Sequence, residues 1–99
     1  MELYEVSNEA DEDLVEIWQR IAFDSVELAN RIDDEFHQLF ASLARLPGQG
    51  HTRADLTSRP FLFIPLHSFL VAYQPDAKPL RVVAVLRGRR NIKRILGGR

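Results

Sequence analysis

The chain has 99 residues with a formal net charge of −1, and 45% of them are hydrophobic, so it can build one hydrophobic core. It has no cysteine, which excludes disulfide bonds and thiolate metal sites. No apolar run is long enough to span a bilayer, and the first residues lack the basic and then apolar pattern of a secretory signal. We therefore expect a single domain over residues 1–99 that works in the cytoplasm without binding a membrane.

The first half of the chain predicts one short strand and two helices. Residues 3–6 are expected to form the strand, and residues 8–23 the first helix, because its apolar side chains recur at helical spacing. Trp18 follows this spacing and is expected in the core. The start signal Asp24-Ser25 predicts a second, longer helix that ends near Pro47. With almost no linker between them, the two helices should form an antiparallel hairpin.

The second half of the chain predicts a loop, three strands and a short helix. Residues 49–59 have no periodic apolar pattern and read as the loop. Beyond them the hydrophobic period changes to two, which predicts strands over residues 61–64, 68–73 and 80–86, followed by a short helix over residues 89–96. Helices kept apart from a run of strands indicate an α+β fold, with the hairpin laid over one face of an antiparallel sheet.

The last two strands carry apolar side chains on both faces. The helical hairpin covers only one face, so the other must be capped by the final helix, by a partner, or by both. Strand alternation gives two possible sets for the capped face. One set is Leu70, Ala72, Val83 and Val85, and the other is Phe69, Val71, Val82 and Ala84.

Charge is divided sharply along the chain. Residues 1–46 hold three arginines against twelve acids, a net charge of −9, whereas residues 47–99 hold ten bases against two acids, a net charge of +8. The division predicts a basic side that binds an anionic partner, either nucleic acid or an acidic protein. The alternative is that both sides are solvated and neutralise each other. The acid-free run from Arg87 to Arg94 favours binding, because a surface that serves only solubility usually mixes the signs.

Three motifs occur in an order that is typical of one protein family. Ile17-Trp18 lies in the first helix, Pro47 to Leu56 fits a Pro-x-x-Gly-x-x-Arg-x-x-Leu loop, and Val82 to Ile92 is similar to a final strand with a Leu-His-Gly-Arg-Arg-Asp-Ile ending. Together with the element order, they resemble the ParE/RelE toxins of bacterial toxin–antitoxin pairs. Arg87 stands where many relatives carry histidine, and Asn91 where they often carry aspartate.

The resemblance implies one of two toxic activities. The superfamily contains ribosome-dependent messenger RNA nucleases and ParE-like proteins that inhibit DNA gyrase. RNA cleavage requires groups that move protons and cations around the phosphate. The nuclease relatives resemble one another in a central lysine pair or in a late histidine and tyrosine, and this sequence has neither. We therefore expect a ParE-like gyrase inhibitor. The alternatives are a ribosome-dependent endoribonuclease and a non-toxic module that only binds an antitoxin.

Four residues are candidates for catalysis, should the protein be an enzyme. His51 and His67 are candidates because imidazole is the usual side chain for proton transfer at neutral pH, although the simpler interpretation is a solvated loop residue for His51 and a solvated turn residue for His67. Arg59 and Arg87 could clamp a phosphate or serve only as ion-pair partners. Scattered histidines without ligand spacing predict no metal site, and no cofactor is expected. The residues expected to bind the target are Arg53, Arg87, Arg89, Arg90, Lys93 and Arg94.

The resemblance also implies a cognate antitoxin of the ParD or RelB kind. A flexible segment of that antitoxin, both acidic and apolar, would lay a helix over the sheet or add a strand to its edge. Its acids would pair with the basic half of the toxin, and the two proteins could form a hetero-oligomer. The toxin residues expected at this interface are Leu70, Ala72, Val83 and Val85.

Overall fold

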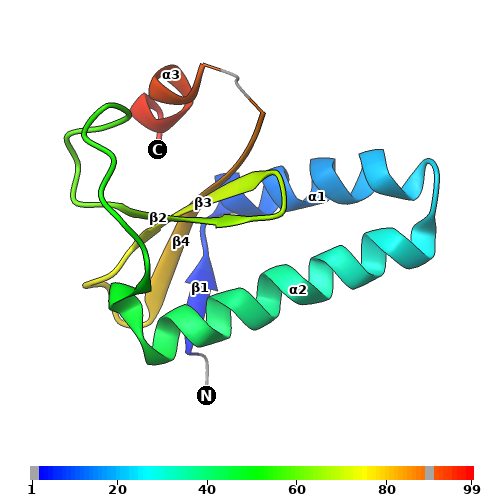
Figure 1. Cartoon of the computed structure of the whole chain (residues 1–99), viewed down its shortest axis with the longest axis horizontal. Helices are drawn as coiled ribbons and strands as arrows, with labels where there is room; N and C mark the ends of the chain where they lie inside the picture. Colours follow the sequence, from blue (N-terminus) through cyan, green and yellow to red (C-terminus); the bar gives the residue numbers. More distant parts are fainter. Residues whose placement is uncertain (1–2, 89–90) are drawn as a thin grey trace.

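The computed structural model describes residues 3–88 and 91–99 and has an α+β fold in the predicted order (Figure 1). The elements are β1 (Tyr4–Val6), α1 (Asn8–Ala22), α2 (Val26–Arg45), the 3₁₀ turn η1 (Pro47–Gln49), β2 (Leu62–Leu66), β3 (Phe69–Gln74), β4 (Leu80–Arg87) and α3 (Ile92–Gly97). Arg89 and Arg90, two of the predicted target-binding residues, lie outside the described residues. Within the described ranges, no helix is both long and apolar enough to cross a membrane.

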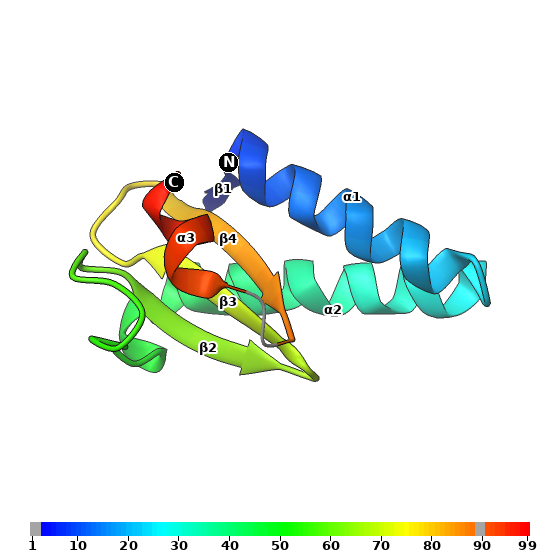
Figure 2. The ribbon, with the colours of Figure 1, turned by 90° about the horizontal axis from the view of Figure 1, so that it is seen from above.

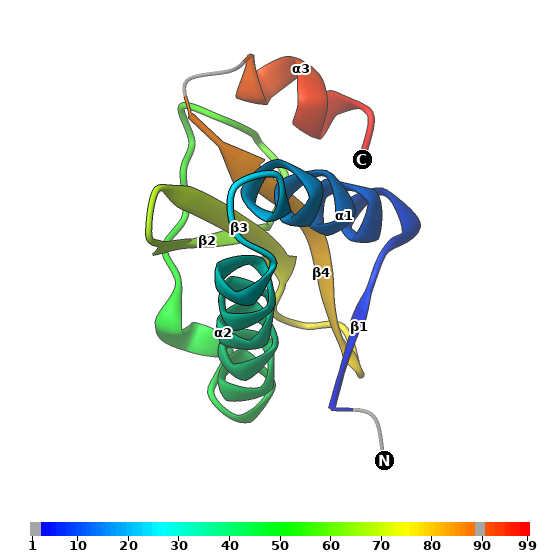
Figure 3. The same cartoon turned by 90° about the vertical axis from the view of Figure 1, so that its right-hand side faces the viewer.

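The four strands form one sheet in the order β1-β4-β3-β2. β2, β3 and β4 are antiparallel neighbours, which confirms the predicted meander. β1 pairs in parallel with β4 at the edge of the sheet, a position that the sequence did not indicate. The α1–α2 hairpin lies against one side of the sheet and α3 lies on the other (Figures 2 and 3).

Both long helices begin at a serine that caps their first turn. The Ser7 hydroxyl accepts a hydrogen bond from the Ala10 backbone N–H at 3.1 Å, and the Ser25 hydroxyl accepts one from the Leu28 N–H at 3.0 Å. Each cap satisfies a backbone donor that has no partner within the helix. In the start signal Asp24-Ser25, the capping residue is therefore Ser25.

The apolar side chains gather on both faces of the sheet. The larger cluster lies between the sheet and the hairpin and is formed by Ala10, Leu14, Ile17, Phe36, Phe40, Leu43, Val71, Tyr73, Leu80, Val82 and Val85. The smaller cluster lies under α3 and is formed by Phe61, Phe63, Ala72, Val83, Ala84, Leu86 and Leu96. Thus α3 covers the sheet face that the hairpin leaves open.

A β-bulge in β4 breaks the simple alternation of side chains. Ala72 is paired with Ala84, but Tyr73 is paired with Val82, so Val83 is an extra residue on β4. Both Val83 and Ala84 consequently belong to the cluster under α3.

The bulge divides each predicted face set between the two sides. Ala72 and Val83 lie in the cluster under α3, and Leu70 packs against that cluster. Val85, from the same predicted set, belongs instead to the hairpin side. In the other predicted set, Val71 and Val82 lie on the hairpin side, whereas Ala84 lies in the cluster under α3. An alternation rule cannot place these residues, because the bulge shifts the pattern by one position.

Trp18 is less buried than its place in the helical stripe predicts. It is only partly buried, and its indole N–H donates a hydrogen bond of 2.9 Å to Asn30 Oδ1. Trp18 therefore links α1 to α2 near the surface of the hairpin and does not belong to the buried core clusters.

Candidate partner-binding surface

Tyr73 fixes the start of the loop that carries Arg53 and Arg59. Its hydroxyl donates a hydrogen bond of 2.6 Å to the Pro47 carbonyl and accepts one of 2.9 Å from the Gly50 N–H. The side chain is fully buried, and this burial raises the pKa of the Tyr73 hydroxyl. The loop therefore leaves η1 from an anchored point on the sheet.

Among the described residues, three arginines of the second half pair with acids of the first half. The pairs are Arg81 with Glu5 at 2.7 Å, Arg87 with Glu16 at 3.8 Å, and Arg99 with Asp13 at 2.8 Å. The idea that the two charged halves neutralise each other is thus correct for part of the basic side. The bases outside these pairs decide where an anionic partner can bind.

Two of these bases, Arg59 and Lys93, line one groove between the loop and α3. Leu56 and Leu96 contribute apolar lining to the groove, together with Thr57, Ser58 and other residues of the loop. The Arg59 guanidinium lies 5.6 Å from the centre of the Phe61 ring, a cation–π arrangement, and does not pair with an acid of the hairpin. Asp55 also lines the groove, but Arg53 binds its carboxylate, so the groove offers positive charge beside apolar surface.

Arg53 is already engaged within the loop. Its guanidinium donates two hydrogen bonds, of 2.9 and 2.8 Å, to the Asp55 carboxylate. These bonds raise the pKa of Arg53 and lower the pKa of Asp55. Both side chains are exposed, so the pair orients the loop without contributing much to stability.

The most connected ion pair in the described structure, Arg99 with Asp13, is not among the residues predicted from the sequence. The Arg99 guanidinium donates hydrogen bonds to both Asp13 oxygens, at 2.8 and 3.0 Å, and to the Val83 carbonyl at 3.1 Å. Asp13 Oδ2 also accepts a hydrogen bond from the Val85 N–H at 3.0 Å. Residues just after α3 are thereby tied to α1 and β4. Nothing in the local sequence links two residues 86 positions apart.

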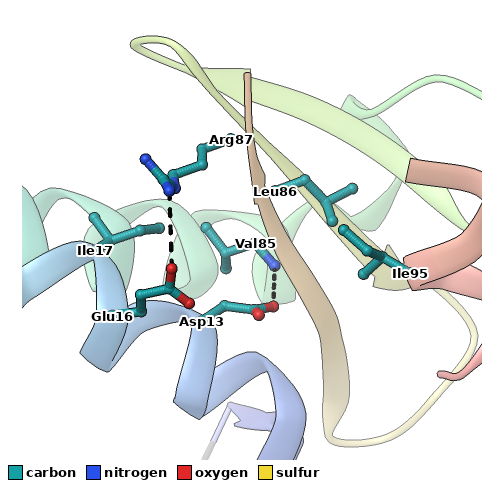
Figure 4. Close-up of a pocket in the computed structure, with 7 residues that line it drawn as sticks. All are labelled: Asp13, Glu16, Ile17, Val85, Leu86, Arg87 and Ile95. Carbon is teal, nitrogen blue, oxygen red and sulfur yellow. Dashed lines mark hydrogen bonds and ion pairs between the residues drawn. The ribbon is translucent and has the colours of Figure 1, made fainter. Parts of the chain in front are cut away.

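A small pocket lies where α1, β4 and α3 meet (Figure 4). Asp13 and Glu16 form its acidic wall, and Ile17 and Ile95 are among its apolar residues. The Arg87 guanidinium reaches Glu16 beside this pocket, as Figure 4 shows. Arg87 therefore faces a carboxylate, and a phosphate that bound it would compete with Glu16.

The other catalytic candidates lie in separate segments. His67 occupies the turn between β2 and β3 with a φ of 54°, and its Nε2 is 3.0 Å from Glu35 Oε2. His51 is exposed, and its backbone pairs with Phe63. Among residues 3–88 and 91–99, no group of three or more histidines and acids is placed to hold a metal ion.

One comparison with known proteins identifies the family, and a second supports the fold. The family model described as "ParE toxin of type II toxin-antitoxin system, parDE" matches residues 4–92. The solved structure titled "Chromosomal ParDE TA system from P. aeruginosa" has a TM-score of 0.71 and 16% identity, over 87% of this chain and 95% of that one, which supports the fold alone. No curated protein matches the sequence. The match over residues 4–92 is decisive, and the chain belongs to the ParE toxin family of type II toxin–antitoxin systems.

Proposed function

We propose that this ParE-family toxin inhibits DNA gyrase in the cytoplasm and is neutralised by a ParD-like antitoxin, in a system that stabilises plasmids. The type II system named in the family description implies a cognate antitoxin. Gyrase as the target follows from the resemblance to ParE-like inhibitors, an argument by analogy.

One observation favours gyrase inhibition over cleavage of ribosome-bound messenger RNA. In the described part of the chain, the groove with Arg59 and Lys93 is lined by no histidine or tyrosine, and its carboxylate, Asp55, is held by Arg53, which lowers the pKa of Asp55 and makes it a weak base. Tyr73 is unsuited to this role, because its buried hydroxyl is held by Pro47 and Gly50. A toxin that acts by binding alone needs no proton-transfer group.

The antitoxin is proposed to bind the sheet face under α3. Ala72 and Val83 are buried there, and Leu70 lies at the margin of the cluster. α3 has only six residues, too few for a stable isolated helix, so its position depends on packing through Leu96 and on the Arg99 contacts. An amphipathic antitoxin segment could therefore take the place of α3. Val85, which the sequence also assigned to the antitoxin interface, lies on β4 but faces the hairpin, so it would not contact the antitoxin segment directly.

Charge complements this placement of the antitoxin. Arg59 and Lys93 line the groove beside α3, and Arg94 is exposed on α3 itself. Acids of the antitoxin segment would meet Arg59, which stays on the loop, and the bases that the displaced α3 carries, while its apolar residues replace those of α3. Ordering a flexible segment costs several kcal/mol, so tight binding needs a buried area above about 2,000 Å².

The target is proposed to contact the basic side of the toxin. The residues assigned to it are Arg53, Arg87, Lys93 and Arg94, together with Arg89 and Arg90 outside the described residues. Lys93 and Arg94 are the exposed members for which no ion pair with a described residue is found. An antitoxin on the neighbouring face would block a target at these positions.

Induced expression with pulse labelling tests the proposed activity. Gyrase inhibition predicts filamentation and DNA damage before protein synthesis falls, and loss of supercoiling by purified gyrase when the purified toxin is added. Early arrest of translation with cleaved messages would instead establish the endoribonuclease alternative. Unaffected growth alongside stable antitoxin binding would identify a non-toxic binding module.

A further inference from the structure

The solvent face of α1 carries apolar side chains that the fold does not use. Phe23, which caps α1, is 91% exposed, and Val15 is 49% exposed. With Glu12 and Gln19 they follow a helical spacing of three or four residues, on the side of α1 opposite its buried stripe. We call Glu12, Val15, Gln19 and Phe23 the outer face of α1. A partner that docked here would bury the Phe23 ring, which the fold leaves 91% exposed, together with Val15.

The position of this face makes it accessible. The turn that follows Phe23 projects well beyond the sheet and α3 (Figures 1 and 2). Glu16, Gln19, Arg20 and Phe23 line a shallow groove on the solvent side of α1. Arg20 Nη2 is 3.4 Å from Glu16 Oε1, so the charges within the groove are already balanced.

The charge around this face indicates which kind of partner it fits. Glu9, Asp11 and Glu12 are exposed in the first turns of α1, and no ion pair joins them to another described residue. Such a surface repels nucleic acid and an acidic antitoxin segment, and it attracts lysine and arginine. Phe23 lies about 16 Å along the helix axis from Glu12, so the two ends of the face fit a partner that has an apolar pocket at one end of its groove and basic side chains at the other.

We propose that the outer face of α1 docks on a protein partner that holds Phe23 in an apolar pocket and surrounds Glu12 with basic side chains. This proposal rests on the toxin function, because the partner is the poisoned target. Glu16 reaches Arg87 at 3.8 Å, so the outer face adjoins the basic side of the toxin. One target can span both surfaces, and an antitoxin on the basic side blocks it by covering half of that contact.

Two substitutions test the anchor and the charge separately. Phe23→Ser removes the anchor, and Glu12→Lys reverses the charge. Their matched controls are Leu46→Ser, at a side chain 65% exposed beyond α2, and Asp34→Lys, at an exposed acid of α2. All four proteins should melt like the wild type and copurify with the antitoxin. Only Phe23→Ser and Glu12→Lys should lose growth arrest, with target binding roughly ten- to a hundredfold weaker.

A photo-cross-linking residue at position 19 gives a readout independent of toxicity. In growing cells it should join the toxin to a protein whose cross-linked peptide lies next to lysine or arginine, and Phe23→Ser or Glu12→Lys should abolish the product. The same probe at exposed Gln38 on α2 is the control and should not give this product. A cross-linked target other than gyrase would defeat the proposed target while leaving the docking surface established.

Four results would overturn the inference. Both α1 variants could arrest growth like the wild type, or position 19 could give no product. The product could contain the antitoxin, which would place that acidic partner on α1. It could also contain a second copy of the toxin, with a change in oligomeric state on Phe23→Ser, which would make the face a self-association surface.

Discussion

Asp13 stabilises the junction of α1, β4 and α3 through a single carboxylate. Substitution by alanine leaves the Val85 N–H without its acceptor and leaves the Arg99 guanidinium with only the Val83 carbonyl, in a partly buried site. We expect the free energy of unfolding to fall by about 2 kcal/mol, because each group loses a charge-assisted hydrogen bond. Urea denaturation measures this, with Asp34→Ala as an exposed control that should match the wild type. Equal stability of the two variants would contradict the assigned role of Asp13.

Tyr73 should make the free energy of unfolding of the protein fall at alkaline pH. Its pKa is raised in the folded state, so above the unfolded value of about 10 the unfolded chain loses a proton that the folded chain keeps. The contribution of Tyr73 to stability is therefore complete below pH 10 and declines as the pH rises above it. Tyr73→Phe should remove this decline, and thermal melts between pH 8 and 11 compare the two proteins.

At neutral pH the same substitution measures the hydrogen bonds of the hydroxyl. Without it, the Gly50 N–H and the Pro47 carbonyl lose their partner, which should cost about 1–2 kcal/mol. A Tyr73→Phe protein as stable as the wild type at pH 7 would show that water replaces the hydroxyl at no cost.

Among the elements, the loop after η1 depends on the close approach of Gly50 to the sheet. A Cβ at this position would lie 2.7 Å from the Tyr73 hydroxyl and 2.9 Å from the Phe63 carbonyl. Gly50→Ala should therefore destabilise the protein by about 1–3 kcal/mol, through overpacking. Gly48 has no neighbour within 4 Å of such a Cβ, so Gly48→Ala is the matched control and should change stability by less than about 0.5 kcal/mol. Similar melting temperatures for both variants would contradict this packing.

The charge of the whole molecule is only partly available to a partner. Arg81, Arg87 and Arg99 are engaged by acids of the first half, whereas the described surface around Arg59 and α3 keeps exposed positive charge. This division explains how a chain with a net charge of −1 can still present a basic binding site.

Toxicity should consequently depend on bases of α3. The double substitution Lys93→Ala with Arg94→Ala should reduce growth arrest at least tenfold in inducer sensitivity while thermal stability stays unchanged, since exposed charges contribute little to folding. Lys78→Ala, in the exposed turn between β3 and β4, is the control and should remain fully toxic. A stable and fully toxic double variant would show that the target does not use α3.

The sequence by itself determined the elements and the family. Apolar spacing and the serine caps placed α1 and α2 within one or two residues, because helix formation follows from local periodicity and capping. The meander was equally local, since each strand pairs with its neighbour in the chain. The motifs up to Ile92 then identified the family, and the family model agrees.

Tertiary structure alone decided which surfaces remain open. The extra residue Val83 in β4 decides which valines of this strand face the hairpin and which face α3. The position of such a bulge depends on how neighbouring strands pair. The Asp13–Arg99 contact joins residues 86 positions apart, and the exposure of Phe23 depends on how far the hairpin extends past the sheet. Periodicity fixes the face of an element on which a side chain lies, whereas only packing between distant segments fixes what covers that face.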